Sequence, residues 1–215
     1  MKLLITAGPT REFIDPVRFI SNAAGGRMGY ALAVASADRG HTVVLVSGPV
    51  AIEAPPSVQT INVVTAQQML EACAANFETC DAAIMTAAVT DWRPRRRADH
   101  KLPKSESMDI SLEQTPDICR WIGERKDRRI LVGFAVQDDA PRERAEEKMA
   151  RKHCDVMVLN SPRAIGSESS KIEIKCGDAP WQGPFSGDKS RHAVRLVTLV
   201  EQLIAERGVQ PAVES

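Results

Sequence analysis

The densest group of chemically useful side chains in this sequence of 215 residues is a basic segment at residues 93–104. It contains six Lys or Arg residues and one acidic residue, Asp99, so its net charge is +5. Cations at this density could neutralise a polyanion such as a triphosphate. A solvated basic loop is the alternative, and for Arg95–Arg97 it is the favoured interpretation, because arginine runs often face water.

A second group is rich in glycine and follows the first predicted strand. Residues 7–26 separate that strand from the first helix, which begins around Gly25-Gly26-Arg27-Met28-Gly29. Such glycines could let a phosphate approach backbone N–H groups at a helix start, or could serve tight packing alone. A nicotinamide dinucleotide in its usual pose is disfavoured. The glycines come late, and the second strand ends in Leu45-Val46-Ser47-Gly48 without an acid for the ribose.

The overall composition excludes several classes of protein. Lys and Arg total 28, Asp and Glu total 28, and the formal net charge is therefore zero. This balance argues against a broad nucleic-acid-binding surface. No apolar run approaches the ~18 residues that a membrane span needs, and the run at residues 2–6 is shorter than a secretory signal requires. We therefore expect a cytoplasmic protein with no nucleic-acid and no membrane partner.

The cysteines and carboxylates give no sign of a metal centre. The five cysteines, Cys73, Cys80, Cys119, Cys154 and Cys176, contain no C-x-x-C pair. We expect reduced, mostly buried thiols. Neither the ligand spacing of a structural zinc site nor a cluster of carboxylates is present in the sequence.

Apolar runs typical of strands alternate with segments typical of helices. The expected strands are 2–6, 42–46, 60–64, 81–86, 130–134 and 155–159, and the expected helices are 26–39, 66–76, 115–127, 139–153 and 188–206. This order predicts an α/β fold: a doubly wound, mostly parallel, Rossmann-like sheet with helices on both faces and a small antiparallel edge or flap. We expect one domain over residues 1–206 and a frayed tail at 207–215.

Some boundaries can be assigned to particular residues. Thr65 is expected to cap its helix, with Gln68 at the capping-box position. Thr115 is expected to cap the helix 115–127, with Pro116 at its first position. Residues 108–112 and 171–175 alternate as strands do, the former at an edge, whereas 87–107 and 176–187 are expected loops. Long loops are usually functional, and loops at the carboxyl ends of parallel strands line the ligand crevice.

A set of longer motifs extends over residues 1–206. They are Gly8-Pro9-Thr10-Arg11-Glu12, Ile14-Asp15-Pro16-Val17-Arg18-Phe19-Ile20-Ser21-Asn22, Gly26-Arg27-Met28-Gly29, Val46-Ser47-Gly48-Pro49, Thr65-Ala66-Gln67-Gln68-Met69, Ala87-Ala88-Val89-Thr90-Asp91-Trp92, Thr115-Pro116-Asp117-Ile118 and Val132-Gly133-Phe134-Ala135, with Lys148 and Lys152. Together they resemble phosphopantothenate–cysteine ligase, also called phosphopantothenoylcysteine synthetase, in a stand-alone bacterial form.

The resemblance implies a reaction of coenzyme A biosynthesis. The family joins 4′-phosphopantothenate to L-cysteine. A nucleoside triphosphate activates the carboxylate as an acyl-nucleotide, pyrophosphate leaves, and the cysteine amine then displaces the monophosphate. CTP is the expected co-substrate, through an acyl-cytidylate, with ATP as the alternative. Mg²⁺ is expected to arrive on the nucleotide, no flavin is expected, and a homodimer is expected.

The resemblance also assigns roles to single residues. Asn22 and Lys101 are expected to be catalytic, Asn22 by holding the acyl-nucleotide and Lys101 by gripping the triphosphate. The expected substrate-binding residues are Gly8, Arg18, Asn22, Gly26, Gly29 and Asn160. The expected nucleotide-binding residues are Thr86, Ala87, Ala88, Asp91, Lys101, Thr115, Pro116, Asp117, Ile118, Phe134, Lys148 and Lys152. In the family, the counterpart of Arg18 reaches across from the partner subunit.

Several of these residues also have plain structural interpretations. Asp91 could cap a turn, and Phe134 could be an ordinary core residue. Lys148 and Lys152 are four residues apart, and could pair with glutamates on one helix, namely Glu143, Glu146 and Glu147.

The sequence departs from the family pattern at two positions. Pro103 stands where a K-x-K-K motif usually has lysine, and Ala24 removes a hydroxyl contact to phosphate. These departures keep a non-catalytic nucleotide-binding paralogue or subunit as an alternative function. An NAD(P)-dependent oxidoreductase is the weaker third possibility.

Overall fold

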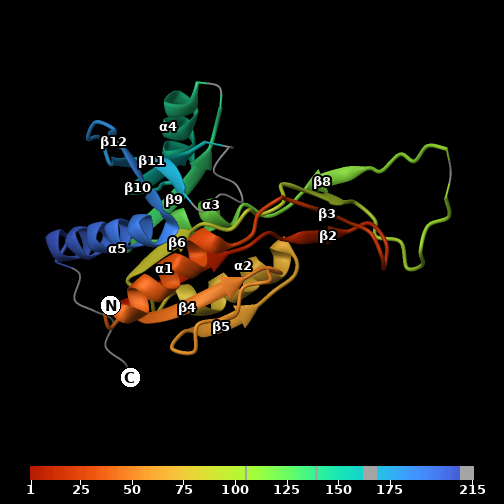
Figure 1. Ribbon diagram of the computed structural model, residues 1–215. Helices are drawn as coiled ribbons and strands as arrows, with labels where there is room; N and C mark the ends of the chain where they lie inside the picture. Colours follow the sequence, from red (N-terminus) through yellow and green to blue (C-terminus); the bar gives the residue numbers. More distant parts are fainter. Residues whose placement is uncertain (105, 139, 162–168, 209–215) are drawn as a thin grey trace.

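The computed structural model describes residues 1–104, 106–138, 140–161 and 169–208. It consists of a body, built around one eight-stranded sheet, and an arm that projects from the body (Figure 1). Across the described residues, every helix is too short or too polar to cross a membrane.

Parallel strands form the centre of the sheet. They are β1 (Lys2–Ala7), β4 (Thr42–Ser47), β5 (Gln59–Asn62), β6 (Ala82–Met85), β9 (Ile130–Val136) and β10 (Val156–Asn160). Two antiparallel strands, β11 (Ser169–Cys176) and β12 (Gln182–Asp188), extend the sheet beside β10. The order is β12-β11-β10-β9-β6-β1-β4-β5. The parallel strands therefore follow the 3-2-1-4-5-6 order of a doubly wound Rossmann sheet.

The central strand β1 shows why these segments form strands. Its residues Leu3, Leu4 and Ile5 are fully buried; Leu3 and Ile5 belong to the core on one face and Leu4 to the core on the other. A strand covered on both faces needs apolar residues at successive positions, which is why the run shows no alternation. Each such side chain stabilises the fold by about 1.5–3 kcal/mol relative to exposure.

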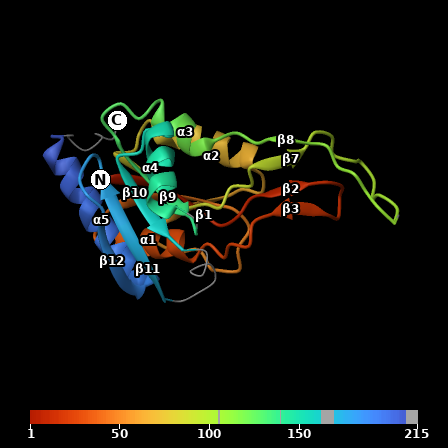
Figure 2. The same ribbon diagram turned by 90° about the horizontal axis from the view of Figure 1, so that it is seen from above.

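Helices cover both faces of the sheet (Figure 2). On one face lie α1 (Arg27–Asp38) and α5 (Lys189–Glu206), which pack against each other; on the other lie α2 (Ala66–Phe77), α3 (Ile118–Gly123) and α4 (Pro141–Arg151). Thr65 caps α2 through the predicted capping box with Gln68. The predicted fold class, with helices on both faces of a mostly parallel sheet, is confirmed.

The arm consists of two antiparallel hairpins whose strands the sequence analysis did not predict. β2 (Arg11–Phe13) pairs with β3 (Phe19–Ser21), and β7 (Trp92–Pro94) pairs with β8 (Leu112–Gln114). We call the described residues of 11–21 and 92–114 the arm. In both views its hairpins run side by side, and their turns lie far from the sheet (Figures 1 and 2).

Three local expectations were wrong. The helix expected from Thr115 begins at Ile118, and its N-cap is Asp117, whose side chain accepts from Arg120 N at 3.1 Å. Residues 108–111 are not a strand, because β8 begins only at Leu112. The expected loop 176–187 contains most of β12, whose glycine and proline residues hide its strand character.

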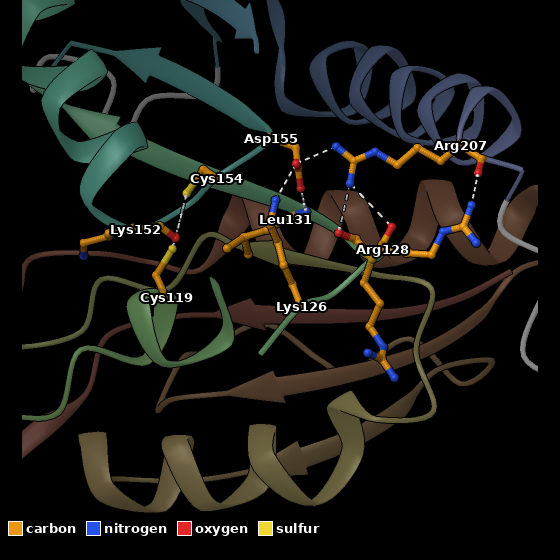
Figure 3. Close-up of polar contacts among 9 residues, drawn as sticks. Cys119, Lys126, Arg128, Leu131, Lys152, Cys154, Asp155 and Arg207 are labelled. Carbon is orange, nitrogen blue, oxygen red and sulfur yellow. Dashed lines mark hydrogen bonds and ion pairs between the residues drawn. The ribbon is translucent and has the colours of Figure 1, made fainter. Parts of the chain in front are cut away.

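The carboxylate of Asp155 fixes the end of α5 to the body (Figure 3). Asp155 Oδ1 accepts from Arg207 Nη2 at 2.6 Å, Asp155 Oδ2 accepts from Leu131 N at 2.7 Å, and Lys126 pairs with the same group. Arg207, which the sequence analysis assigned to the tail, is therefore held in place. Residues 209–215 of that tail lie outside the described residues.

Candidate functional site

The candidate site lies where β1 and β6 end side by side in the middle of the sheet. The strand order reverses between these strands, and open α/β sheets bind ligands at this position. The chain leaves β1 through Gly8 and leaves β6 through Thr86, Ala87 and Ala88. Ala88 N donates to Gly8 O at 2.9 Å, and Thr86 Oγ1 donates to Thr6 O at 2.5 Å. Four predicted site residues therefore come together here.

The glycines at the start of α1 have two different roles. A Cβ added at Gly29 would lie 2.5 Å from Ala7 Cβ and 2.7 Å from Thr86 Oγ1, so this glycine lets the helix touch the sheet. Gly26 is the N-cap, with φ of 75°, and no described side chain caps the helix there. The first amides of α1 are therefore the donors that an anion would meet. Tight packing therefore explains Gly29, whereas the approach of a phosphate at Gly26 stays a prediction.

Asn22 is fixed at the same point. Its Nδ2 donates to Ala88 O and to Val89 O, at 3.1 Å in each case. An amide nitrogen carries two hydrogens, so both are used on the backbone. The side-chain oxygen is then the group that Asn22 can offer to a substrate, as an acceptor. Because the side chain is exposed, a substrate can reach it.

A series of threonines connects the crevice to the base of the arm. Thr90 N donates to Thr10 Oγ1 at 2.9 Å, and Thr115 Oγ1 donates to Thr90 O at 2.5 Å. Thr115 N also donates to Asp91 O at 3.0 Å. Thr115 is thus a structural link rather than a helix cap, and it holds the backbone of Asp91 close to the partners of Asn22. The Asp91 side chain is exposed.

Arg18 is held at the far end of the arm by Asp15. Asp15 is fully buried, and its Oδ2 accepts from Arg18 Nη2 at 2.6 Å, from Arg18 Nε at 2.9 Å and from Leu102 N at 3.1 Å. Its Oδ1 accepts from the amides of Val17 and Arg18 at 2.8 Å. Burial alone would raise the pKa of Asp15, but these donors hold it well below its usual range. One carboxylate therefore joins Arg18 to the segment that carries Lys101.

The basic segment divides into tethered and exposed cations. Arg93 Nε donates to Glu113 Oε1 at 2.9 Å, and the Arg97 guanidinium lies 5.0 Å from the Phe13 ring centroid. Arg95 and Arg96 are exposed, as the simpler interpretation of this run predicts. Lys101 is also exposed and lines a hollow of about 720 Å³ in the loop between β7 and β8.

Lys148 and Lys152 lie on the α3 and α4 side of the sheet, but not as a pair with the helix glutamates. Lys152 is the C-cap of α4, and its Nζ pairs with Asp117 Oδ1 at 3.0 Å. Lys148 Nζ donates to Phe134 O at 2.8 Å, and burial lowers the pKa of this amine. The structure thus joins four predicted nucleotide residues in two contacts.

The remaining predicted residues divide between rim and core. Asn160 is partly exposed at the carboxyl end of β10, where its Oδ1 accepts from Ser161 N at 2.9 Å. Pro116 is partly exposed. Ile118 is 2% exposed and belongs to the core, so its side chain serves packing. The Phe134 side chain packs against the core of the other face.

Arg18 and Lys101 are not brought to the crevice of their own chain. They belong to the turn of the first hairpin and the loop of the second, which lie at the far end of the arm (Figures 1 and 2). The predicted residues therefore form three separate groups: the crevice, the Asp117–Lys152 side and the arm tip.

Two residues that organise the candidate site, Asp15 and Thr10, were not predicted from the sequence as site residues. Asp15 lies within the quoted I-D-P-V-R motif, three residues before Arg18, and this spacing allows a local Asp–Arg contact. Thr10 gave no signal, because its partner Thr90 is 80 residues away in the chain. Within the described residues, no group of three or more His, Cys, Asp or Glu side chains could hold a metal ion.

The fold and the crevice define a Rossmann-like α/β protein with helix amides and a positioned amide side chain at the switch point of its sheet. The comparisons then give the family: residues 1–203 match the model described as DNA/pantothenate metabolism flavoprotein C-terminal domain, and the chain belongs to this family. The resemblance seen in the sequence motifs is confirmed at the level of the family.

Similar proteins agree with this assignment. The chain is 43% identical over 167 residues to the coenzyme A biosynthesis bifunctional protein CoaBC of Bacillus subtilis (strain 168), covering 77% of this chain and 41% of that protein. It is 41% identical over 215 residues to the protein of the same name from Escherichia coli (strain K12), covering 96% and 51%. The chain thus spans about half, or less than half, of the length of these curated relatives.

A solved structure also matches most of the chain. The crystal structure of the C-terminal domain of coenzyme A biosynthesis bifunctional protein CoaBC superposes with a TM-score of 0.83. It is 36% identical, and the match covers 95% of this chain and 96% of that one.

Proposed function

We propose that this chain is a phosphopantothenate–cysteine ligase that joins 4′-phosphopantothenate to L-cysteine through an acyl-cytidylate formed from CTP. The observation that carries the proposal is the position of Asn22. Its amide is held by Ala88 O and Val89 O at the switch point, beside the first amides of α1. The family match and the names of the relatives, which concern coenzyme A biosynthesis, support the same reaction.

The proposed chemistry rests on charge and position. Two polyanions must meet, so the site needs donors and cations that are fixed before the reaction. The amides after Gly26 would receive the substrate phosphate. Asn22 would help to hold the acyl-nucleotide, with its side-chain oxygen accepting a hydrogen bond from the attacking amine of cysteine. Lys101 and Arg18 would neutralise phosphate charge. Magnesium would enter with the triphosphate, because the described residues offer it no carboxylate cluster.

We further propose that Arg18 acts in the crevice of a second copy of the chain. Its own crevice is distant, and the arm carries several exposed apolar side chains that a partner could cover, among them Val17, Phe19 and Trp92. A homodimer would place the arm tip of each copy over the other body.

The decisive experiment measures pyrophosphate release from each of the four nucleoside triphosphates with Mg²⁺, 4′-phosphopantothenate and L-cysteine. We expect release with CTP, and ATP is the alternative. The ligase assignment fails if no nucleotide supports turnover. Tight CTP binding without pyrophosphate release would instead support the non-catalytic paralogue suggested by Pro103 and Ala24.

The role of Asn22 can be tested by half-reactions. Asn22→Asp places a carboxylate oxygen against the carbonyls of Ala88 and Val89, so we expect the cysteine-dependent second half-reaction to lose more rate than acyl-nucleotide formation. The matched control is Asn76→Asp, an amide change outside the site. The Nδ2 of Asn76 likewise donates to a backbone carbonyl, Ala72 O on α2. Equal losses in both half-reactions would contradict the assigned role.

The partner role of Arg18 can be tested with a mixed dimer. Chains carrying Arg18→Ala and Asn22→Ala should each be inactive alone. A purified heterodimer of the two should regain activity, because one of its crevices has an intact Asn22 and receives Arg18 from the other chain. No recovery in the heterodimer would place Arg18 at the crevice of its own chain.

A further inference from the structure

Two cysteines outside the proposed reaction, Cys119 and Cys154, lie in direct contact (Figure 3). Each follows by two residues a member of the Asp117–Lys152 ion pair. Cys119 is on α3 and Cys154 is in the turn between α4 and β10, and their sulfur atoms are 3.7 Å apart. A disulfide needs about 2.05 Å between sulfurs, so a small approach of α3 would suffice. Cys119 is partly exposed, whereas Cys154 is buried. An oxidant would therefore reach Cys119 first.

The surroundings make the two thiols unequal. The hydrogen bond between the two sulfurs lowers the pKa of Cys119, and the ammonium groups of Lys152 and Lys148 lower it further, against the effect of burial. The same contact and burial raise the pKa of Cys154. Cys119 is thus the attacking sulfur and Cys154 the resolving one, which is the division of roles that thiol–disulfide exchange requires.

The pair also connects two parts of the proposed nucleotide site. Cys119 follows Asp117 by two residues, and Cys154 follows Lys152 by two residues. The Asp117–Lys152 ion pair therefore bridges the same two segments as the sulfur contact. A covalent bond between the sulfurs would hold these segments together and keep Lys152 on Asp117.

We propose that Cys119 and Cys154 form a thiol modification site, which a small disulfide such as oxidised glutathione converts to an intramolecular disulfide, and that this bond lowers the ligase activity. The Cys119 thiolate attacks one sulfur of oxidised glutathione and releases one glutathione thiolate. Cys154 then loses its proton and attacks Cys119 Sγ, which releases the second glutathione. Two protein thiols are oxidised, and one glutathione disulfide is reduced to two thiols. The claim about activity rests on the proposed function; the claim about the bond does not.

The bond is tested by mass spectrometry. The reduced protein is incubated with excess oxidised glutathione, the remaining thiols are blocked with N-ethylmaleimide, and tryptic peptides are analysed. We expect a cross-link between the peptides of Cys119 and Cys154, loss of two of the five free thiols, and reversal by dithiothreitol.

Single variants give each cysteine its own readout. Cys154→Ser should trap a glutathione mixed disulfide on Cys119, because the resolving thiol is gone. Cys119→Ser should leave Cys154 reduced, because that thiol is buried. Cys176→Ser is the matched control. Cys176 is also partly exposed, but burial and Glu206 raise its pKa, so this variant should form the same cross-link as the unchanged protein.

The outcomes separate the bond from its effect. A stable mixed disulfide on Cys119 of the unchanged protein, or no reaction at either cysteine, overturns the modification site. A complete cross-link with undiminished pyrophosphate release overturns the control of activity. If the reduced protein fails to release pyrophosphate from any of the four nucleoside triphosphates, the proposed function fails. The presence or absence of the cross-link still decides the modification site.

Discussion

The body and the arm hold their candidate functional residues in opposite ways. In the body, Asn22 and the α1 amides are fixed by backbone contacts above strands whose side chains, such as Leu4, are completely buried. In the arm, Arg18 is fixed by one buried carboxylate, Asp15, while Phe19 and Trp92 remain 41% and 47% exposed. The candidate residues of the body are therefore positioned by its core, whereas Arg18 at the arm tip is positioned by one polar cluster.

The largest effect is expected from opening the body core. Leu4→Ala should lower the free energy of unfolding by about 2–5 kcal/mol, because a fully buried side chain is lost and leaves a cavity. Denaturant unfolding measures the loss. Val34→Ala, at a side chain 42% exposed on α1, should change stability by less than about 0.5 kcal/mol. Similar values for the two variants would contradict the core assigned to β1.

A smaller effect is expected at the contact of α1 with the sheet. Gly29→Ala should cost about 1–3 kcal/mol, because its Cβ would lie 2.5 Å from Ala7 Cβ. Gly25→Ala is the matched control, since nothing lies within 4 Å of a Cβ there. Both can be measured by urea unfolding. A neutral Gly29→Ala would show that packing does not require this glycine.

At the arm tip, activity should change more than stability. Asp15→Asn places an amide N–H₂ or a weaker acceptor against the Arg18 and Leu102 donors, so we expect a marked fall in pyrophosphate release with a smaller loss of stability than Leu4→Ala causes. Activity assays and urea unfolding of the two variants make the comparison. If Asp15→Asn lost more stability than Leu4→Ala and little pyrophosphate release, the arm would not be held in a different way from the body.

The acid side of the stability profile gives a second readout of Asp15. Its pKa is lowered on folding, so its contribution to stability is present above its ordinary pKa of 3.8 and is lost as the pH falls below that value. The free energy of unfolding, measured between pH 7 and pH 3, should therefore fall less steeply with decreasing pH in Asp15→Asn than in the unchanged protein. Parallel profiles would mean that Asp15 carries the same pKa in both states.

The smallest effect is expected from an ion pair on the surface of the body. Glu201 accepts from Arg39 Nη2 at 2.5 Å and contacts His41 Nε2 at 2.7 Å, joining α5 to α1 and the turn after it. Glu201→Gln should cost only about 0.2–1 kcal/mol, because water screens partly exposed pairs. The difference from the unchanged protein should shrink in 1 M salt. A larger, salt-independent loss would contradict this.

Most of the body could be predicted from the sequence, and most of the arm could not. The body strands are continuous apolar runs, such as residues 2–6 and 42–46, whose burial on both faces produces the pattern directly. The arm strands are three residues long and half-exposed, so they carry no periodicity. The strand β12 was not predicted for another reason: it contains Gly183, Pro184 and Gly187, and these residue types are typical of loops.

The candidate site shows a similar division. Gly8, Asn22 and Thr86–Ala88 were predicted from family motifs, and the structure brings them to one crevice because each follows or faces the end of a central strand. The contact of Lys148 with Phe134 O could not be predicted, since it depends on the packing of α4 over β9. The Thr10–Thr90 link needs contact across 80 residues, which no local pattern records.

The joint between arm and body is buried and combines neutral partners with one carboxylate, because Glu12 Oε1 of β2 accepts from Ala66 N of α2 at 2.8 Å. Threonine hydroxyl groups and backbone atoms make the contacts among Thr10, Thr90 and Thr115, whereas the arm tip depends on the charged pair of Asp15 and Arg18. Dissolved ions have little effect on neutral hydrogen bonds. Dissolved anions do gather around exposed cations such as Lys101 and Arg96 and screen their charge. We therefore expect salt to compete for the exposed cations of the arm tip and to weaken the proposed binding of phosphate there, while the buried contacts of the joint hold the arm in place.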